Sequence, residues 1–248
     1  MKRRATRYAL AFGAALAIAG SACRADADPP PGKVSGAFEI VRPIGAVYDE
    51  YNSDGGGDAY PEALGVRGYV RKGKYAVWLD YRRNVYLTEQ YKNFLTEYPR
   101  LEGGYGTVPP FLARDSSFEA RFERELGIRD VYAGVGFDHT WQNYNFPELR
   151  GFGAGLEKLA SDVPGVRPFG SVYYYPWTSG PYTTETLPHM ELNPSFRILK
   201  IDYGFRVQSR SALYFVAGYG NEFRRGRGYP AQIRFIRSDT SLGLGTRF

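Results

Sequence analysis

The chain contains only two histidines, His139 and His189, so any histidine-based catalysis has to be built around one of them. A general base has to lie within hydrogen-bond reach of a nucleophile, and a third group usually orients it. His139 directly follows Asp138, which in an extended strand places the two side chains on opposite faces. Trp141 shares the face of His139, so His139 is predicted to belong to an interfacial aromatic belt.

The second histidine, His189, lies in a long segment with Glu185, Glu191 and Ser195 nearby. Loop histidines are usually solvated, and nothing in this spacing fixes a base against a nucleophile. The chain is therefore predicted to be no enzyme.

A metal site has one weak candidate, the segment "NSDGGGD" with Asn52, Asp54 and Asp58. Its oxygen ligands suit calcium, but it lacks the spacing and the terminal glutamate of an EF-hand loop. A glycine-rich turn is the favoured interpretation, and we expect no metal and no cofactor.

Many charged residues occupy every second position of segments that are otherwise aromatic or aliphatic. In "DVYAGVGFDHTWQ", Val131, Val135 and Phe137 share one face while Asp138 lies on the other, and "RILKIDYGFRV" and "KYAVWLDYRR" repeat the pattern. The apolar faces are predicted to point outwards, including Val131, Val135, Leu199 and Ile201. The inward charges predicted from this alternation are Arg67, Asp80, Arg82, Glu119, Arg121, Glu123, Glu125, Asp138, Lys200, Asp202 and Arg206.

The elements that position these residues are about ten strands bounded by glycine, proline or charge clusters. They are expected at 35–49, 62–71, 74–87, 116–126, 130–143, 149–159, 166–177, 195–207, 211–223 and 231–248. A composition with 21 Tyr, 16 Phe, 30 Gly and 16 Pro favours strands and turns.

Residues 116–126 also fit a helix. Phe118, Phe122 and Leu126 recur at i, i+4 and i+8, Ser116 with Glu119 resembles a capping box, and Gly127 could end the helix. The topology favours a strand, because without it the strand count is odd and the turn "LGIRD" falls at the wrong end.

The connections alternate between short ones such as "RKGK" and "QSRS" and long ones such as the segment after residue 87. With an up-and-down order, every short turn falls at one end and the long connections fall at the other. This asymmetry is typical of a closed antiparallel transmembrane β-barrel with short periplasmic turns and long external loops.

The N-terminus carries a basic start, "MKRRATR", and a short apolar run typical of a secretory signal peptide. We expect a signal peptide at 1–27, a tether at 28–34 and the barrel at 35–248, with lipidation at Cys23 as the alternative to cleavage after Ala27. Cys23 is the only cysteine, so no intrachain disulfide forms. Of 32 basic and 26 acidic residues, the leader removes five and one, which leaves 27 and 25 and weakens any nucleic-acid interpretation.

The chain ends in "SLGLGTRF", with Leu242 and Leu244 alternating towards Phe248. Together with the leader, the alternating strands and the asymmetric loops, this ending resembles the small outer-membrane β-barrel proteins of double-membraned bacteria. The resemblance implies that the barrel-assembly machinery reads Leu242, Leu244 and Phe248, although Thr246 stands where an aromatic residue is common. The chain also resembles omptin-type proteases in strand number, but their paired-aspartate and Asp-x-His elements are not seen.

The expected function is a structural or cell-surface role in the bacterial outer membrane, with the lumen filled by a charged network. The alternatives are a narrow polar pore for small solutes, a surface enzyme, and a soluble periplasmic ligand-binding barrel with inverted faces.

The expected partners are outer-membrane lipid and the assembly machinery. A surface glycolipid or polysaccharide is a candidate partner for Arg224, Arg225 and Arg227, which are expected on one external loop. Tyr173, Tyr174, Tyr175 and Trp177 are expected in an outer aromatic girdle or sugar-stacking platform.

Overall fold

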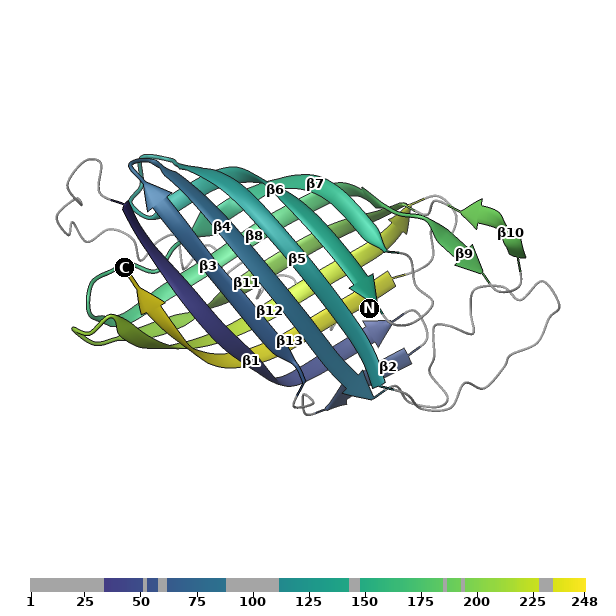
Figure 1. The fold of residues 1–248 in the computed structure, drawn as a ribbon, viewed down its shortest axis with the longest axis horizontal. Coiled ribbons are helices and arrows are strands. Elements are labelled where there is room, and N and C mark those ends of the chain that lie inside the picture. The colour runs from purple at the N-terminus through teal and green to yellow at the C-terminus, as the bar shows by residue number, and fades with distance from the viewer. Residues whose placement is uncertain are drawn as a thin grey trace, which may run out of the picture.

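A computed structural model describes residues 34–50, 53–57, 62–87, 112–142, 148–184, 187–192, 195–227 and 234–248. Ten long strands form an antiparallel sheet that closes on itself through pairing of the last strand with the first (Figure 1). These strands are β1 (Val34–Glu50), β3 (Leu64–Lys72), β4 (Tyr75–Leu87), β5 (Leu112–Glu125), β6 (Val131–Gln142), β7 (Leu149–Lys158), β8 (Gly165–Ser179), β11 (Ser195–Gln208), β12 (Leu213–Arg227) and β13 (Arg234–Arg247).

Three short strands lie beside this ring. β2 (Ser53–Gly57) pairs with the end of β1, and β9 (Tyr182–Thr184) pairs with β10 (Leu187–Leu192) in a separate hairpin. Among the described residues, no helix is long and apolar enough to cross a membrane. The fold is the predicted all-β closed barrel, with all ten predicted strands present.

Residues 116–126, for which the sequence allowed either a helix or a strand, form part of a strand. β5 pairs residue for residue with β4 on one side and with β6 on the other. A helix there would leave the facing backbone groups of both neighbours without partners, a cost that outweighs a local helical pattern.

The two ends of the barrel differ in their connections. Short turns join β3 to β4, β5 to β6, β7 to β8 and β11 to β12, and all lie at the end of the barrel that also holds the C-terminus (Figure 1). Gly73 and Gly127 adopt φ angles of 59° and 84° in two of these turns, which side chains with a Cβ rarely adopt. We call this end the turn end and the opposite end the loop end.

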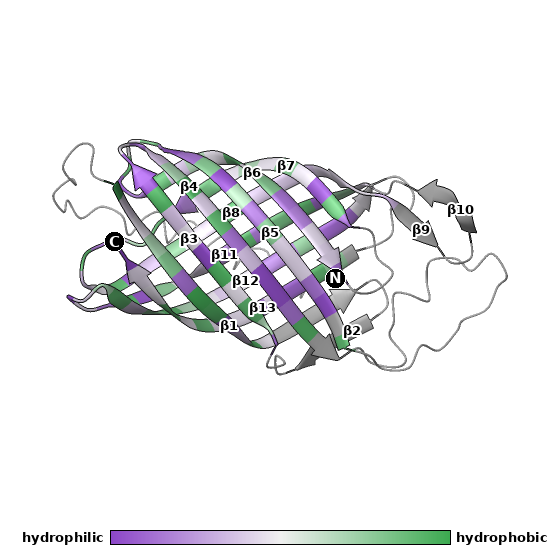
Figure 2. Cartoon of the chain, in the orientation of Figure 1, coloured by the Kyte–Doolittle hydropathy of each residue, from purple (hydrophilic) through white to green (hydrophobic). Residues whose placement is uncertain are grey.

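The two faces of the barrel wall differ in polarity, and hydrophilic and hydrophobic residues alternate along the coloured parts of the barrel strands (Figure 2). Val135 is 60 % exposed, Phe205 53 % and Leu244 68 %, all on the outside. Charged side chains such as Glu119 and Arg121 are buried inside. This arrangement is opposite to that of a soluble barrel with an apolar interior, so the inverted-face alternative is wrong.

The barrel closes at the turn end through Gly36 on β1 and Phe248. Their backbones exchange two hydrogen bonds, Gly36 N to Phe248 O at 3.0 Å and Phe248 N to Gly36 O at 3.1 Å. A Cβ at Gly36 would lie 2.5 Å from the Tyr69 carbonyl oxygen and 2.7 Å from the Phe248 ring. The absence of a side chain at Gly36 therefore lets the last residue reach the first strand.

Replacing Gly36 by valine is expected to displace Phe248 and to lower the free energy of unfolding by about 1–3 kcal/mol, the usual cost of overpacking. Urea unfolding of the barrel reconstituted in lipid vesicles measures the change. Phe38→Val, on the same outer face of β1, is the control because it adds no atom at the seam. Equal urea midpoints for Gly36→Val and the unmodified protein would show that the seam tolerates a side chain there.

Candidate functional site

The lumen is crossed near its middle by the side chain of Arg82. Arg82 lies on β4, and its guanidinium contacts Asp80 at 2.6 Å and Asp202 of β11 at 2.8 Å. Four strands separate β4 from β11 in either direction around the ring. This ion pair therefore joins diametrically opposite walls.

A second bridge lies closer to the loop end. Arg224 of β12 contacts Asp115 of β5 at 3.2 Å, and four strands again separate β5 from β12 in either direction. Arg237 of β13 contacts the same Asp115 at 3.0 Å, and both arginines also pair with Glu222. Asp115, Arg224 and Arg237 are each at most 2 % exposed, so this cluster fills the lumen at its level.

A third network is centred on Glu119 of β5. Glu119 pairs with Arg121 at 2.7 Å and with Lys200 of β11 at 3.3 Å, and it accepts a hydrogen bond from the Tyr175 hydroxyl. Lys200 also contacts Asp138 of β6 at 2.5 Å.

The same network extends to β7 and β8. Arg121 reaches Glu157 of β7 at 2.7 Å, and its guanidinium stacks 4.2 Å from the Tyr173 ring centroid. The Tyr173 hydroxyl donates to Glu123. A residue at 136 with a Cβ would approach the Tyr175 hydroxyl to 2.7 Å, so Gly136 provides the space for this tyrosine.

A fourth network occupies the lumen towards the turn end. Glu39 of β1 pairs with Arg67 of β3 and with Arg206 of β11 at 2.6 Å, and it accepts a hydrogen bond from the Tyr214 hydroxyl at 2.9 Å. The Arg67 guanidinium lies 4.9 Å from the ring centroid of Phe169 on β8, across the barrel. Charged, hydrogen-bonded and aromatic groups thus fill this level together.

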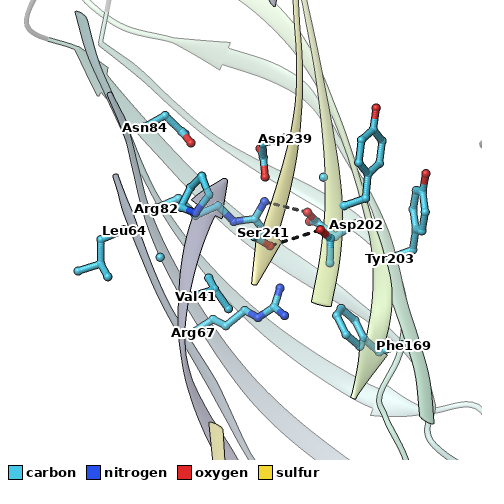
Figure 3. A pocket seen from close by; sticks show the side chains of 15 residues that line it. Val41, Leu64, Arg67, Arg82, Asn84, Phe169, Asp202, Tyr203, Asp239 and Ser241 are labelled. Carbon is cyan, nitrogen blue, oxygen red and sulfur yellow. Dashed lines mark hydrogen bonds and ion pairs between the residues drawn. The ribbon is translucent and has the colours of Figure 1, made fainter. Parts of the chain in front are cut away.

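A small cavity remains beside Arg82, lined by Asn84, Asp202 and Asp239 among others (Figure 3). Its volume of about 20 Å³ is room for a single water molecule. Asn84 Nδ2 and Asp202 Oδ2 are buried without a hydrogen-bond partner in the described structure. A hydrated ion does not fit a space of this size.

The structure brings nearly all of the predicted inward charges into these four networks. The exception is Glu125, which lies at the turn end and accepts a hydrogen bond from the Asp130 backbone N–H at 2.9 Å. Sequence reasoning missed further lumen charges besides Arg224, among them Glu39, Arg71, Asp115, Glu157, Glu222, Arg237 and Asp239. Each stands at an inward position of its strand, so extending the alternation rule to every strand would have found them.

The predicted arginine loop needs correction. β12 continues through Arg227, so residues 224–227 form strand and not loop. Arg224 points inwards and is 1 % exposed, whereas Arg225 is exposed on the outer wall. The side chain of Arg227 lies outside the described residues.

The predicted aromatic girdle is also corrected in part. Tyr173 and Tyr175 are fully buried in the lumen, and only Tyr174 and Trp177 point outwards, 43 % and 65 % exposed. A bulge in β8 between Tyr175 and Thr178 shifts the alternation at this point. These two tyrosines occupy successive inward positions and donate hydrogen bonds to the lumen carboxylates Glu123 and Glu119, which the girdle interpretation did not foresee.

His139 lies on the outer wall and next to Trp141, with ring centroids 4.8 Å apart. Its Nε2 lies 2.6 Å from Glu148, and hydrogen bonds from Arg150 and His139 hold the pKa of Glu148 below its usual value. No group of three potential metal ligands occurs in the described part of the chain. The side chains of His189, Asn52, Asp54 and Asp58 lie outside it.

The predicted assembly residues lie along the outside of β13 and at its end. Leu242 is 37 % exposed, Leu244 68 % and Phe248 66 %. That an assembly factor recognises these three residues stays a prediction.

Comparisons with known proteins found no matching family model and no matching curated protein. Among solved structures, the chain is similar to the outer membrane protease OmpT of Escherichia coli, with 10% identity over 90% of this chain and 99% of that chain and a TM-score of 0.41. It is also similar to the toluene transporter TodX of Pseudomonas putida (8% identity, 89% and 90% coverage, TM-score 0.31). A third likeness is to the attachment invasion locus protein Ail of Yersinia pestis (9% identity, 88% and 99% coverage, TM-score 0.29).

These neighbours carry different activities, and identities and scores this low assign none of them to this chain. The assignment of the fold as a closed barrel follows from the strand order of this chain, in which the last strand pairs with the first.

Proposed function

We propose that this protein is a non-enzymatic barrel of the bacterial outer membrane, with a lumen closed by its own ion pairs and a structural or cell-surface role. The single observation that carries the closed lumen is the pair of bridges between opposite walls, Arg82 with Asp202 and Arg224 with Asp115. Each spans the full width of a ten-stranded ring, which is close to the size that side chains alone fill.

The membrane location is supported by the outer wall. Large apolar side chains are exposed all around the ring, among them Val135, Phe152, Phe205 and Leu244, with exposed fractions from 53 % to 74 %. A soluble monomer rarely exposes an apolar surface of that extent, whereas lipid tails cover it without cost. The leader predicted at 1–27 is the matching export signal.

The surface role rests on the topology. The connections between β4 and β5, between β6 and β7 and between β8 and β11 all join strand ends at the loop end. In an outer-membrane barrel this end faces the outside of the cell. We include Leu242, Leu244 and Phe248 in the proposal as the assembly signal.

Membrane fractionation of the protein expressed with its leader tests the location, followed by gel migration of boiled and unboiled samples. Recovery in the outer membrane with a heat-dependent mobility shift is expected. A soluble periplasmic product without a shift would reject the proposal.

Planar-bilayer recording tests the closed lumen. The unmodified protein is expected to show no conductance steps, because four networks of ion pairs and hydrogen bonds fill the lumen. A triple variant with Asp80, Arg82 and Asp202 changed to alanine removes one network and is expected to remain silent or to flicker, because the other three networks persist.

The second candidate function, a narrow pore, is favoured by the excess of carboxylates over cations among the inward side chains. Steady cation-selective steps in the unmodified protein, altered by Glu119→Gln, would establish it and overturn the closed lumen. Glu62→Gln, at an exposed outer position paired with Arg114 at 3.2 Å, is the control that should leave such steps unchanged.

A further inference from the structure

The turn between β7 and β8, residues 159–164, folds into the mouth of the lumen at the turn end. Leu159 and Ala160 are 1 % and 0 % exposed, and they belong to one cluster of buried side chains with Tyr69 and Tyr132 of the inner wall. By contrast, the turns from β3 to β4 and from β11 to β12 consist only of exposed residues. The β7–β8 turn therefore covers the mouth with apolar side chains instead of projecting into water.

An ion pair holds this turn against the opposite wall. Asp162 contacts the guanidinium of Arg71 on β3, and four strands separate β3 from β8 in either direction around the ring. The same guanidinium contacts Asp130 in the β5–β6 turn at 2.8 Å and donates to the Ser35 hydroxyl of β1 at 2.7 Å. Arg71 thus connects two turns and two strands across the mouth.

Two hydrogen bonds to backbone carbonyl groups complete the closure. The N–H of Leu159 donates to the carbonyl oxygen of Asp130 at 2.8 Å. Arg247 of β13 donates to the carbonyl oxygen of Asp162 and, at 3.3 Å, to that of Ser211 in the β11–β12 turn. The β7–β8 turn is therefore held by β3, by β13 and by a neighbouring turn.

The contact between Arg71 and Asp162 can open at lower cost than the bridges deeper in the lumen. The Asp162 side chain is 35 % exposed, whereas that of Asp130 is 5 % exposed, so water can replace the partner of Asp162. Breaking the contact leaves Arg71 paired with Asp130, so no buried arginine loses its only carboxylate.

We propose that residues 159–162 form a plug that closes the lumen at the turn end, and that the Arg71–Asp162 pair is the latch that releases it. When the latch opens, the plug moves outwards, and the space that it vacates becomes accessible from the periplasm, which this end of an outer-membrane barrel faces. The network of Glu39 and Arg206 lies deeper and stays in place, so release opens a vestibule and no continuous pore. The inference rests on the closed lumen proposed above.

Thiol labelling measures the position of the plug, because Cys23 is the only cysteine of the chain. In a Cys23→Ser background, Ala160→Cys places a single thiol at a fully buried position of the plug. The protein expressed with its leader is purified in detergent and treated with a water-soluble maleimide, and the labelling rate is followed by mass spectrometry. Adding Asp162→Asn is expected to raise this rate about tenfold or more, as for loss of a hydrogen bond between charged groups.

The matched control is Glu62→Gln, which also removes one carboxylate charge but lies before β3 at the loop end, where it should leave the rate unchanged. Two further thiols calibrate the measurement. Ala212→Cys is exposed in the β11–β12 turn and should label rapidly in every background, whereas Ser117→Cys replaces a side chain that is 4 % exposed and should stay protected. A heat-dependent mobility shift shows that each variant is folded.

Hydrogen exchange of the unmodified protein gives a second measurement that needs no variant. The Leu159 amide is expected to exchange more slowly than the amides of the exposed turn at 209–212 and faster than the paired amides of β7, because a releasable plug opens without unfolding the wall. Protection of Leu159 equal to that of β7 would show that the turn does not open by itself.

Three labelling results would overturn the proposal. Equal rates for Ala160→Cys with and without Asp162→Asn would show that the ion pair does not hold the plug. Rapid labelling before Asp162 is changed would show that the mouth is already open. Labelling of Ser117→Cys in the Asp162→Asn background would show that the whole barrel has loosened. Conductance of the unmodified protein decides the closed lumen separately, so the plug and the closed lumen can fail independently.

Discussion

Replacing Val135 by arginine is expected to lower the free energy of unfolding by about 2–4 kcal/mol, the cost of arginine at the middle of the bilayer on the lipid face of a barrel. Val135 lies in the central part of β6 and is 60 % exposed on the outer wall. An arginine there has no inward partner to reach, because its side chain points away from the lumen. The arginine side chain must therefore either extend to the interface or cause the bilayer to thin around its charge.

Urea unfolding in lipid vesicles, followed by tryptophan fluorescence, measures the loss. Leu126→Arg is the matched control, because Leu126 is 53 % exposed in the turn between β5 and β6 and its arginine meets water. The control should change stability by about 0–1 kcal/mol, as at the interface. If Val135→Arg behaves like Leu126→Arg, the outer wall of β6 does not face lipid.

Replacing Arg82 by methionine is expected to cost about 3–5 kcal/mol, because breaking a buried pair leaves uncompensated charge. Arg82 is the cation that contacts both Asp80 and Asp202, which are 4 % and 8 % exposed. Methionine retains much of the volume but none of the charge. The carboxylates of Asp80 on β4 and Asp202 on β11 then lie in the lumen without the cation that neutralises them.

The neighbouring Arg83 gives the control for this change. Arg83 points to the outside, its side chain is 39 % exposed, and its contact with Glu62 is 3.8 Å long. Arg83→Met should therefore change stability by about 0–1 kcal/mol, as is usual for an exposed pair. Adding Asp80→Asn and Asp202→Asn to Arg82→Met should restore a large part of the loss, because no charge remains unpaired at this level. A triple variant as unstable as Arg82→Met would show that the ionic bridge is not the cause.

The sequence alone determined the strand order, the closed barrel and the polarity of its two faces. Each of these follows from local information: a period of two along a strand, turn residues at fixed places, and the lengths of the connections. The choice at 116–126 needed one further step, since the local helical pattern lost to the backbone pairing that β4 and β6 require. That pairing is a property of the whole ring, and only the even strand count and the placement of the turn "LGIRD" pointed to it.

The tertiary structure decided which charges meet. Arg82 and Asp202 are 120 residues apart in sequence, and their contact depends on the register of every strand between them and on the stagger of the ring. A single bulge in β8 turned Trp177 outwards, and the extension of β12 by a few residues placed Arg224 in the lumen and left Arg225 beside Arg197 outside. Alternation determines which face of the wall a residue occupies. Its partner across the lumen depends on how far each strand is shifted along the barrel axis, and no local pattern encodes that shift.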